Sequence, residues 1–361
     1  VEFLAHYYER HGTPLRARLM GNIHTVSKLA APIAPLANLA MTTRLARPAM
    51  SLMKVHSERR LSPFVRRTFV HRWKTHRKHN PVPAKTRGQI LYFHDTFATY
   101  NYPRIGLAAV KLLEAAGFEV LIEERRACCG RPMLSKGLVE SARKVARKNV
   151  ALLAPYAKKG IPIIGTEPSC ILTLRDEYKD LLPNDANVQV VAENSFMIDE
   201  YLAKLDAEGE LGINWKTNSG PEVFFHGHCH QKALIGVEPS MAMLHSAGCR
   251  PTESGAGCCG MAGSFGYEKE HYDVSKKIGE ERLFPSIEAT SVDVQVSVAG
   301  VSCRQQIEHF TSRSTRHIAE MLASRIDTDK PWKAPTLPVP EDIEPTEEVE
   351  VFAKSQSDGP A

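Results

Sequence analysis

The feature that most constrains the fold is an internal repeat. Residues 91–170 read LYFHDTF…ACCGRP…GTEPSC, and residues 223–303 read VFFHGHC…AGCCGMAG…AGVSC, so that His94 matches His226. The spacings between matching positions differ by only a few residues, which indicates a duplicated unit of roughly 130 residues. The chain is therefore expected to contain two copies of one supersecondary arrangement.

Each copy has the same order of strand and helix signals. An apolar run (QILYF, VFF) is followed by a helical stretch, the CCG loop, a long helical stretch, a second apolar run (IPIIG, VQVSVAG) and a helix after a cysteine. Strands that alternate with helices predict parallel βαβ units, hence an α/β fold of two pseudo-symmetric halves. We expect the CCG loops at the carboxyl ends of the strands, where open α/β sheets hold ligands.

The chain divides by composition into four segments. These are a helical, basic N-terminal segment (1–88), the first repeat (89–215), the second repeat (216–326) and an acidic, proline-rich tail (327–361) that is expected to be disordered. Basic residues dominate from Arg59 to Lys78, and this stretch contains no acidic residue. It could dock on a partner, bind to an anionic membrane surface or form a solvated linker. We expect no nucleic-acid partner.

No apolar run reaches the roughly 20 residues of a membrane span, and the first residues lack the apolar core of a signal peptide. We therefore expect a cytoplasmic protein, peripheral on the inner face of the membrane at most. Clustered cysteines in a cytosolic chain indicate metal binding or redox chemistry more often than disulfides.

The second copy supplies four thiols from three separate loops: Cys229, Cys258, Cys259 and Cys303. Four thiolates are the usual ligands of a structural zinc ion or an iron–sulfur cluster. Side chains of adjacent cysteines diverge, which suits a cluster with several metal atoms better than one small ion. Two alternatives stay open: a zinc-bound or metal-free scaffold that serves in protein interactions, and thiol–disulfide chemistry at the vicinal pair.

Polar residues flank these cysteines. The candidates for a supporting role are His226, His228, His230 and Arg304. A histidine here can act as a ligand or a proton carrier, and a cation beside a cluster raises its reduction potential. The alternative for each is an ordinary hydrogen-bonded loop residue or a surface charge.

The first copy is poorer in thiols. It keeps Cys128, Cys129 and Cys170, but Phe97 stands where the second copy has Cys229. These three cysteines form either a second site or a vestigial one. Cys249 lies outside the repeated pattern and is interpreted as a buried apolar residue.

The motifs ACCGRPMLSKGL, EPSC, HGHCHQKA, CCGMAGSFGYE and SCRQQI together resemble the cysteine-rich CCG domain. That domain occurs in heterodisulfide reductases, in the iron–sulfur subunits of glycolate oxidase and anaerobic glycerol-3-phosphate dehydrogenase, and in flavin-linked 2-hydroxyacid dehydrogenase fusions of the D-lactate and D-2-hydroxyglutarate type. The resemblance covers about residues 1–325. It implies a [4Fe-4S] cluster on the four cysteines of the second copy, and electron transfer from a flavin dehydrogenase of a small 2-hydroxyacid to a quinone or another carrier.

The chain departs from the fullest family pattern. It has neither a ferredoxin-like C-x-x-C-x-x-C motif nor a recognisable FAD domain, and each repeat ends in a single cysteine rather than a C-x-x-C pair. The resemblance therefore implies FAD and ferredoxin-like clusters on a missing domain or partner. The opening VEFLAHYYERHGTPLRARLMGN resembles the stretch after the last ferredoxin motif of the fusions, so we expect the tail of a longer polypeptide or a separately encoded dehydrogenase half. The chain would thus be part of an oxidoreductase.

Overall fold

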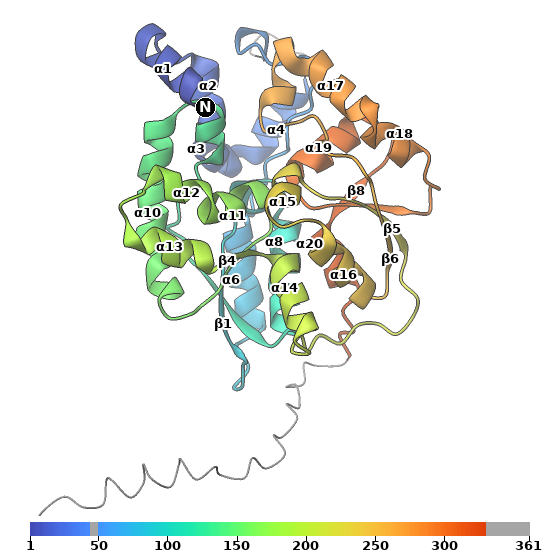
Figure 1. The fold of residues 1–361 in the computed structure, drawn as a ribbon. Coiled ribbons are helices and arrows are strands. Elements are labelled where there is room, and N and C mark those ends of the chain that lie inside the picture. The colour runs from blue at the N-terminus through green and yellow to red at the C-terminus, as the bar shows by residue number, and fades with distance from the viewer. Residues whose placement is uncertain (44–49, 330–361) are drawn as a thin grey trace, which may run out of the picture.

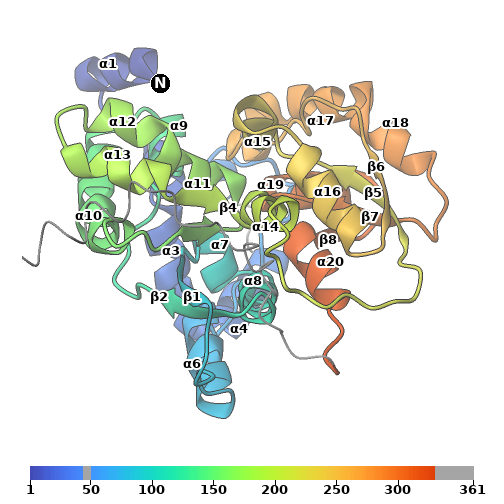
Figure 2. The same ribbon diagram turned by 60° about the horizontal axis from the view of Figure 1, so that its bottom comes forward.

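The computed structural model describes residues 1–43 and 50–329, so the tail expected to be disordered lies outside the described residues from position 330 onward. Along the chain, a helical N-terminal segment is followed by two four-stranded sheets (Figures 1 and 2).

The first sheet belongs to the first repeat and is entirely parallel. Its strands are β1 (Gly88–Tyr92), β2 (Phe118–Ile122), β3 (Ile163–Gly165) and β4 (Ser195–Met197), in the order β2-β1-β3-β4. The helices between and after them are α7 (Thr96–Tyr100), α8 (Pro103–Ala115), α9 (Arg131–Ser135), α10 (Val139–Ala157), α11 (Pro168–Arg175), α12 (Glu177–Leu181), α13 (Ala186–Glu193) and α14 (Ile198–Ala207).

The second sheet has the same topology. Its parallel strands are β5 (Glu222–His226), β6 (Arg250–Glu253), β7 (Gln295–Val298) and β8 (Thr315–His317), in the order β6-β5-β7-β8. Its helices are α15 (Cys229–Leu234), α16 (Glu238–Ser246), the 3₁₀ turns η2 (Phe265–Tyr267) and η3 (Lys269–His271), α17 (Tyr272–Glu281), α18 (Leu283–Glu288), α19 (Val301–Phe310) and α20 (Ile318–Ser324). The matching strand order confirms the predicted α/β fold of two repeats.

The long helix expected after each CCG loop differs between the repeats. In the first repeat α10 runs unbroken, whereas in the second the corresponding stretch is divided at Arg282 into α17 and α18. Pro285, in the first turn of α18, has no N–H to donate to a carbonyl of α17, so the helix restarts rather than continues.

The two halves pack reciprocally. Helix α8 of the first repeat packs against α20 of the second, and α14 of the first packs against α16 of the second. One core cluster takes in side chains from both repeats, including Ile90 and Phe225, while the outer face of each sheet has a cluster of its own. The repeats therefore share a core, and Figure 2 shows them side by side.

The N-terminal segment folds as α1 (Glu2–His11), α2 (Leu15–Gly21), α3 (Ile23–Ala30), the 3₁₀ turn η1 (Ala31–Ile33), α4 (Ala34–Thr42) and α6 (Phe69–His79). Helices α2, α3 and α6 pack on α9, α7 and α8 of the first repeat. Arg16 of α2 also donates to Glu270 of the second repeat at 2.9 Å. Within the described ranges, no helix combines the length and the apolar character that crossing a bilayer requires.

Candidate metal centre

The four cysteines of the second repeat lie at one edge of its sheet. Cys229 begins α15 directly after β5, the pair Cys258–Cys259 follows β6, and Cys303 lies in the first turn of α19 after β7. Because β5, β6 and β7 are parallel neighbours, their carboxyl ends meet at the same edge. The topology therefore brings together thiols that are up to 74 positions apart between Cys229 and Cys303 (303 − 229).

The four thiols influence one another electrostatically in series, Cys229 with Cys258, Cys258 with Cys259, and Cys259 with Cys303. The ligand atoms of Cys259 and Cys303 lie within 4.8 Å of each other. Cys259 and Cys303 are buried, at 5% and 1% exposure, whereas Cys229 is exposed. The cysteine set thus extends from the core to the surface.

The four thiols differ in the direction in which their pKa values are shifted. The neighbouring thiols of Cys229 and Cys259 hold the pKa of Cys258 well below its ordinary value, and Cys259, with the His226 ring nearby, does the same for the pKa of Cys303. Cys258, together with burial, raises the pKa of Cys229 and that of Cys259. Thiolates are the form that binds metal.

The backbone around the vicinal pair is adapted to close packing. The amide N–H of Gly260 points at the Sγ atom of Cys258, at 3.3 Å. Gly260 has a φ of 88°, and a Cβ atom there would collide with the carbonyl oxygen of Ser275. Only glycine fits this position, because other residues rarely adopt this φ and the space is already filled.

His226 completes the buried part of the site. Its Nδ1 atom is hydrogen-bonded to Ser254 Oγ at 2.9 Å, and the side chain is fully buried. Its Nε2 atom has no hydrogen-bond partner in the described part of the chain. One ligand atom from each of His226, Cys259 and Cys303 lies within 4.8 Å of the others. A buried, unpartnered ring nitrogen beside thiols fits a group that the site would hold.

The other three flanking residues have different surroundings. His228 caps α15, accepting from the His230 amide at 3.1 Å, and its Nε2 atom lies 3.2 Å from Ser169 Oγ. His230 lies 3.8 Å from Glu177. The Arg304 guanidinium is paired with Glu320 at 2.6 Å. Their roles at a metal centre stay predictions.

The three cysteines of the first repeat also meet. The Sγ atoms of Cys129 and Cys170 are 3.1 Å apart. All three cysteines are buried and free of disulfides. The neighbouring Cys129 and burial raise the pKa of Cys128, and Phe97 supplies no ligand where the second repeat has Cys229. The first set is therefore a smaller, more protonated version of the second.

Sequence reasoning missed a residue that links the two cysteine sets. Glu167, three positions before Cys170, accepts a hydrogen bond from the backbone N–H of Val301 at 2.9 Å and one from Ser169 Oγ at 3.1 Å. Val301 begins the helix that carries Cys303. Burial, with Asp95 nearby, raises the pKa of Glu167 to about 8. The Glu-Pro dipeptide at the start of α11 was the available signal, but it does not identify a partner in the other repeat.

Two further groups of acids and histidines resemble metal sites but already have cationic partners. In one, which contains Asp176, Glu177 and His230, Arg131 is paired with Glu177. In the other, which contains Glu268, Glu270 and His271, the partners are Lys136 and Arg16. The cysteine set of the second repeat, four thiols with an unpartnered imidazole nitrogen, is the arrangement that fits an iron–sulfur cluster.

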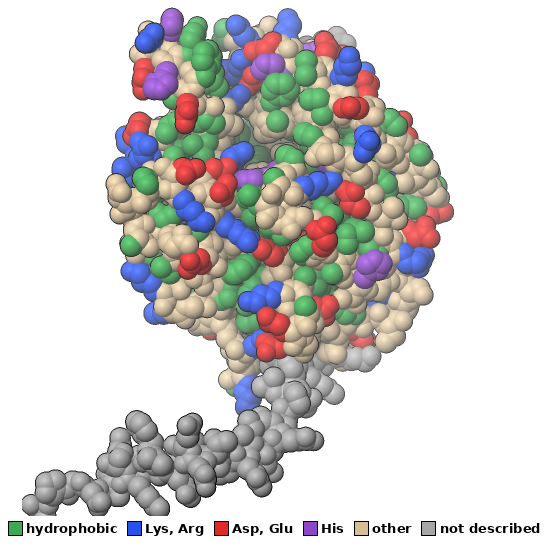
Figure 3. All heavy atoms as spheres, in the orientation of Figure 1, with side chains coloured by type: hydrophobic (Ala, Val, Ile, Leu, Met, Phe, Trp, Pro, Cys, Tyr) green, Lys and Arg blue, Asp and Glu red, His purple; other side chains and the backbone are tan. Residues whose placement is uncertain are grey.

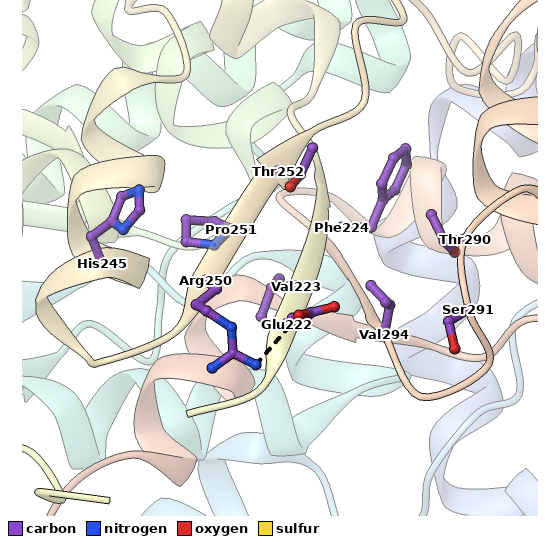
Figure 4. Close-up of a pocket in the computed structure, with 10 residues that line it drawn as sticks. All are labelled: Glu222, Val223, Phe224, His245, Arg250, Pro251, Thr252, Thr290, Ser291 and Val294. Carbon is purple, nitrogen blue, oxygen red and sulfur yellow. Dashed lines mark hydrogen bonds and ion pairs between the residues drawn. The ribbon is translucent and has the colours of Figure 1, made fainter. Parts of the chain in front are cut away.

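A surface pocket of about 530 Å³ lies away from the thiols. Figure 4 shows it at the amino-terminal side of the second sheet, where Arg250 reaches Glu222 at 3.4 Å and Phe224 and Val294 line the opposite wall. The carboxyl ends of the same strands carry the cysteines, so this pocket is separate from the centre.

Comparisons with known proteins agree with the repeat. Residues 90–175 and 223–308 each match the profile of the family described as CCG, cysteine-rich domain. One of the subunits of anaerobic glycerol-3-phosphate dehydrogenase from Escherichia coli (strain K12) is 29% identical over 334 residues, which cover 88% of this chain and 79% of that protein.

Two other relatives match a shorter part of the chain. D-2-hydroxyglutarate dehydrogenase of Escherichia coli (strain K12) is 27% identical over 235 residues, 64% of this chain but 22% of that longer protein. Lactate utilization protein A of Bacillus subtilis (strain 168) is 26% identical over 234 residues, 61% of this chain and 93% of that protein. The resemblance inferred from the sequence motifs is confirmed: the chain contains two copies of the cysteine-rich CCG domain, one in each half.

Proposed function

We propose that this chain is an iron–sulfur electron-transfer component of a flavin-linked dehydrogenase, and that Cys229, Cys258, Cys259 and Cys303 hold a [4Fe-4S] cluster. The observation that carries the proposal is the convergence of these four cysteines at the carboxyl edge of the second sheet, where His226, Cys259 and Cys303 offer ligand atoms within 4.8 Å of one another. When bound, the cluster supplies one-electron redox chemistry.

The residues of the chain hold, orient and shield the group. Cys259 and Cys303 anchor it in the core, Gly260 lets the loop pack closely, and His226 presents its Nε2 atom beside the buried thiols. Cys229 lies at the surface, where an electron can be exchanged with a partner. In this proposal the three thiols of the first repeat form the vestigial counterpart, which shapes the interface between repeats.

The proposed partner is a flavin dehydrogenase domain or subunit with FAD and ferredoxin-like clusters. The names of the relatives support this: one is a dehydrogenase subunit, one a 2-hydroxyacid dehydrogenase and one a lactate utilization protein. The substrate, a small hydroxy compound of the 2-hydroxyacid type, would be oxidised on that partner. A quinone or another carrier would accept the electrons.

The N-terminal helices are the proposed docking surface for the partner or for an anionic membrane. They expose large apolar side chains: Phe3, Leu15, Leu29, Ile33, Leu36, Leu39 and Leu52. Figure 3 shows hydrophobic side chains at the surface near the top of the molecule, where these helices lie. The basic helix α6 adds positive charge. A peripheral, cytoplasmic location is part of the same proposal.

The experiment that tests the function is anaerobic reduction of the purified protein, followed by visible and electron paramagnetic resonance spectra. We expect a brown protein that is bleached by photoreduced FMN, used as a flavin electron donor, and that regains its colour with a quinone analogue. A colourless protein that binds one zinc ion would support the scaffold alternative instead. Reversible formation of a Cys258–Cys259 disulfide without iron would support thiol–disulfide chemistry.

A further inference from the structure

The N-terminal segment inserts one buried guanidinium behind the cysteines of the second repeat. Arg59 is 4% exposed. Its Nε atom donates to the carbonyl oxygen of Gly266 at 2.6 Å, and its Nη2 atom donates to Gln306 Oε1 at 2.8 Å and Ser275 Oγ at 3.1 Å. The sequence places Arg59 at the start of a basic run and gives no sign that it is buried.

This cation has no carboxylate partner among the described residues. Its hydrogen-bond acceptors are all neutral, and its Nη1 atom has none. The rings of Tyr267, Tyr272 and Phe310 surround it, with centroids 4.7 to 5.9 Å from the Cζ atom. Aromatic faces attract a cation, but burying a charge without a counter-ion is still unfavourable. The position therefore calls for a negative charge nearby.

The contacts of Arg59 reach each element that presents a buried thiol. Gly266 belongs to the loop that contains Cys258 and Cys259, and Gln306 lies three positions after Cys303 on α19. Ser275, on α17, carries the carbonyl oxygen that lies against Gly260. Arg59 therefore contacts both the segment that carries Cys258 and Cys259 and the helix that carries Cys303.

We propose that Arg59 is a positioning residue of the cysteine centre, whose buried charge raises the reduction potential of the metal group held there. This inference rests on the proposed function. One-electron reduction adds one negative charge to the centre, and a fixed positive charge in a low-dielectric surrounding favours the more negative state. The oxidised cluster with four thiolates already carries negative charge, which supplies the counter-ion that Arg59 lacks.

Arg304, which follows Cys303 in the sequence, differs from Arg59 because it has a carboxylate partner. Its guanidinium is paired with Glu320 at 2.6 Å, so its charge is largely compensated. Arg313, which is half-buried, offers a control. It also donates only to neutral oxygens, those of Thr290 and Val294, but it does so at the amino end of β7, opposite the thiols.

The test is a redox titration of the anaerobically purified full chain with dithionite as electron donor and mediators, followed by electron paramagnetic resonance. The variants are Arg59→Gln, Arg59→Met, Arg59→Lys and Arg313→Gln, each with its iron content and melting temperature. We expect the two neutral variants at position 59 to keep iron and to lose on the order of tenfold in the equilibrium constant for reduction, about 59 mV for one electron.

The conservative variant separates charge from structure. Arg59→Lys loses the bond to Gly266 and should melt earlier, yet its potential should stay near that of the wild type because the charge remains. Arg313→Gln should melt earlier without any change in potential. An unchanged potential in Arg59→Gln and Arg59→Met, or loss of iron from both, would overturn the proposal in favour of a purely structural role. A wild-type protein without iron would instead overturn the proposed function.

Discussion

The carboxyl group of Glu167, in the first repeat, accepts a 2.9 Å hydrogen bond from the backbone N–H of Val301, the first residue of the helix that carries Cys303 in the second. Glu167 is itself three positions from Cys170. One buried side chain therefore connects the loops that present the two cysteine sets, and the repeats hold each other's thiols in place.

Replacing Glu167 tests this connection. Glu167→Ala leaves the buried Val301 N–H without an acceptor, and we expect it to lower the free energy of unfolding by about 1–3 kcal/mol. Burial, with Asp95 nearby, raises the pKa of Glu167 to about 8, which favours the neutral acid at pH 7. Glu167→Gln keeps the shape, the neutral charge and an acceptor oxygen, and should cost clearly less. Urea unfolding of both variants at pH 7 makes the comparison, and equal losses would contradict a capping role.

Removing one thiol of the second set should remove the metal. Cys259 is adjacent to Cys258 in the sequence and its ligand atom lies within 4.8 Å of that of Cys303, so Cys259→Ser removes a thiol from the middle of the set. We expect loss of the visible absorbance and of most iron, with the α/β fold retained by circular dichroism. The matched control is Cys249→Ala, because Cys249 is equally buried but lies before β6, at the opposite end of the sheet. It should keep iron and cost about 1 kcal/mol of stability. Iron loss in the control and not in Cys259→Ser would show that the ligands are misassigned.

The first cysteine set should be dispensable for iron. Cys129 and Cys170 lie 3.1 Å apart in the core, but Phe97 leaves them without a fourth thiol. We expect the double variant Cys129→Ser/Cys170→Ser to keep the iron content of the wild type while losing stability, since two buried hydroxyl groups replace thiols. Halved iron content would mean that the first repeat holds a cluster of its own.

The N-terminal segment gives the protein a defined acid sensitivity. His24 of α3 lies 3.0 Å from Thr96 Oγ1, and burial, followed by Arg126, lowers its pKa to about 3. Below pH 6.5 His24 becomes protonated in the unfolded chain, whereas in the folded chain it stays neutral down to about pH 3. The free energy of unfolding therefore falls as the pH drops through this window, by at most about 1.4 kcal/mol per pH unit.

His24→Gln should flatten this dependence. The amide can still hydrogen-bond Thr96 but does not titrate, so the stability lost as the pH drops from the ordinary histidine pKa of about 6.5 to about 5 should be smaller than in the wild type. His79→Gln, on exposed α6, serves as the control and should retain the wild-type slope. A slope unchanged in His24→Gln would mean that other groups account for the acid sensitivity.

The sequence predicted the repeated α/β architecture and the meeting of the four thiols, because periodic apolar runs and cysteines at strand ends are local signals. Two strands of each sheet were not predicted. The strands β4 and β8 have three residues each, Ser195–Met197 and Thr315–His317, which carry no distinguishable alternation. The strands β2 and β6 directly follow the helical stretches and were not separated from them, and β6 contains a proline and no apolar run. Glu167 and Arg59 were not predicted either. Their roles depend on which segments pack together, and neither a Glu-Pro dipeptide nor one arginine in a basic run contains that information.

The most direct test of the account is the iron and acid-labile sulfide content of the anaerobically purified chain, measured with its visible spectrum. We predict about four irons with matching sulfide per chain, as expected for one [4Fe-4S] cluster. About one zinc ion, or a folded chain without metal, would contradict it and would leave a scaffold that has kept the cysteines of its family without their redox role.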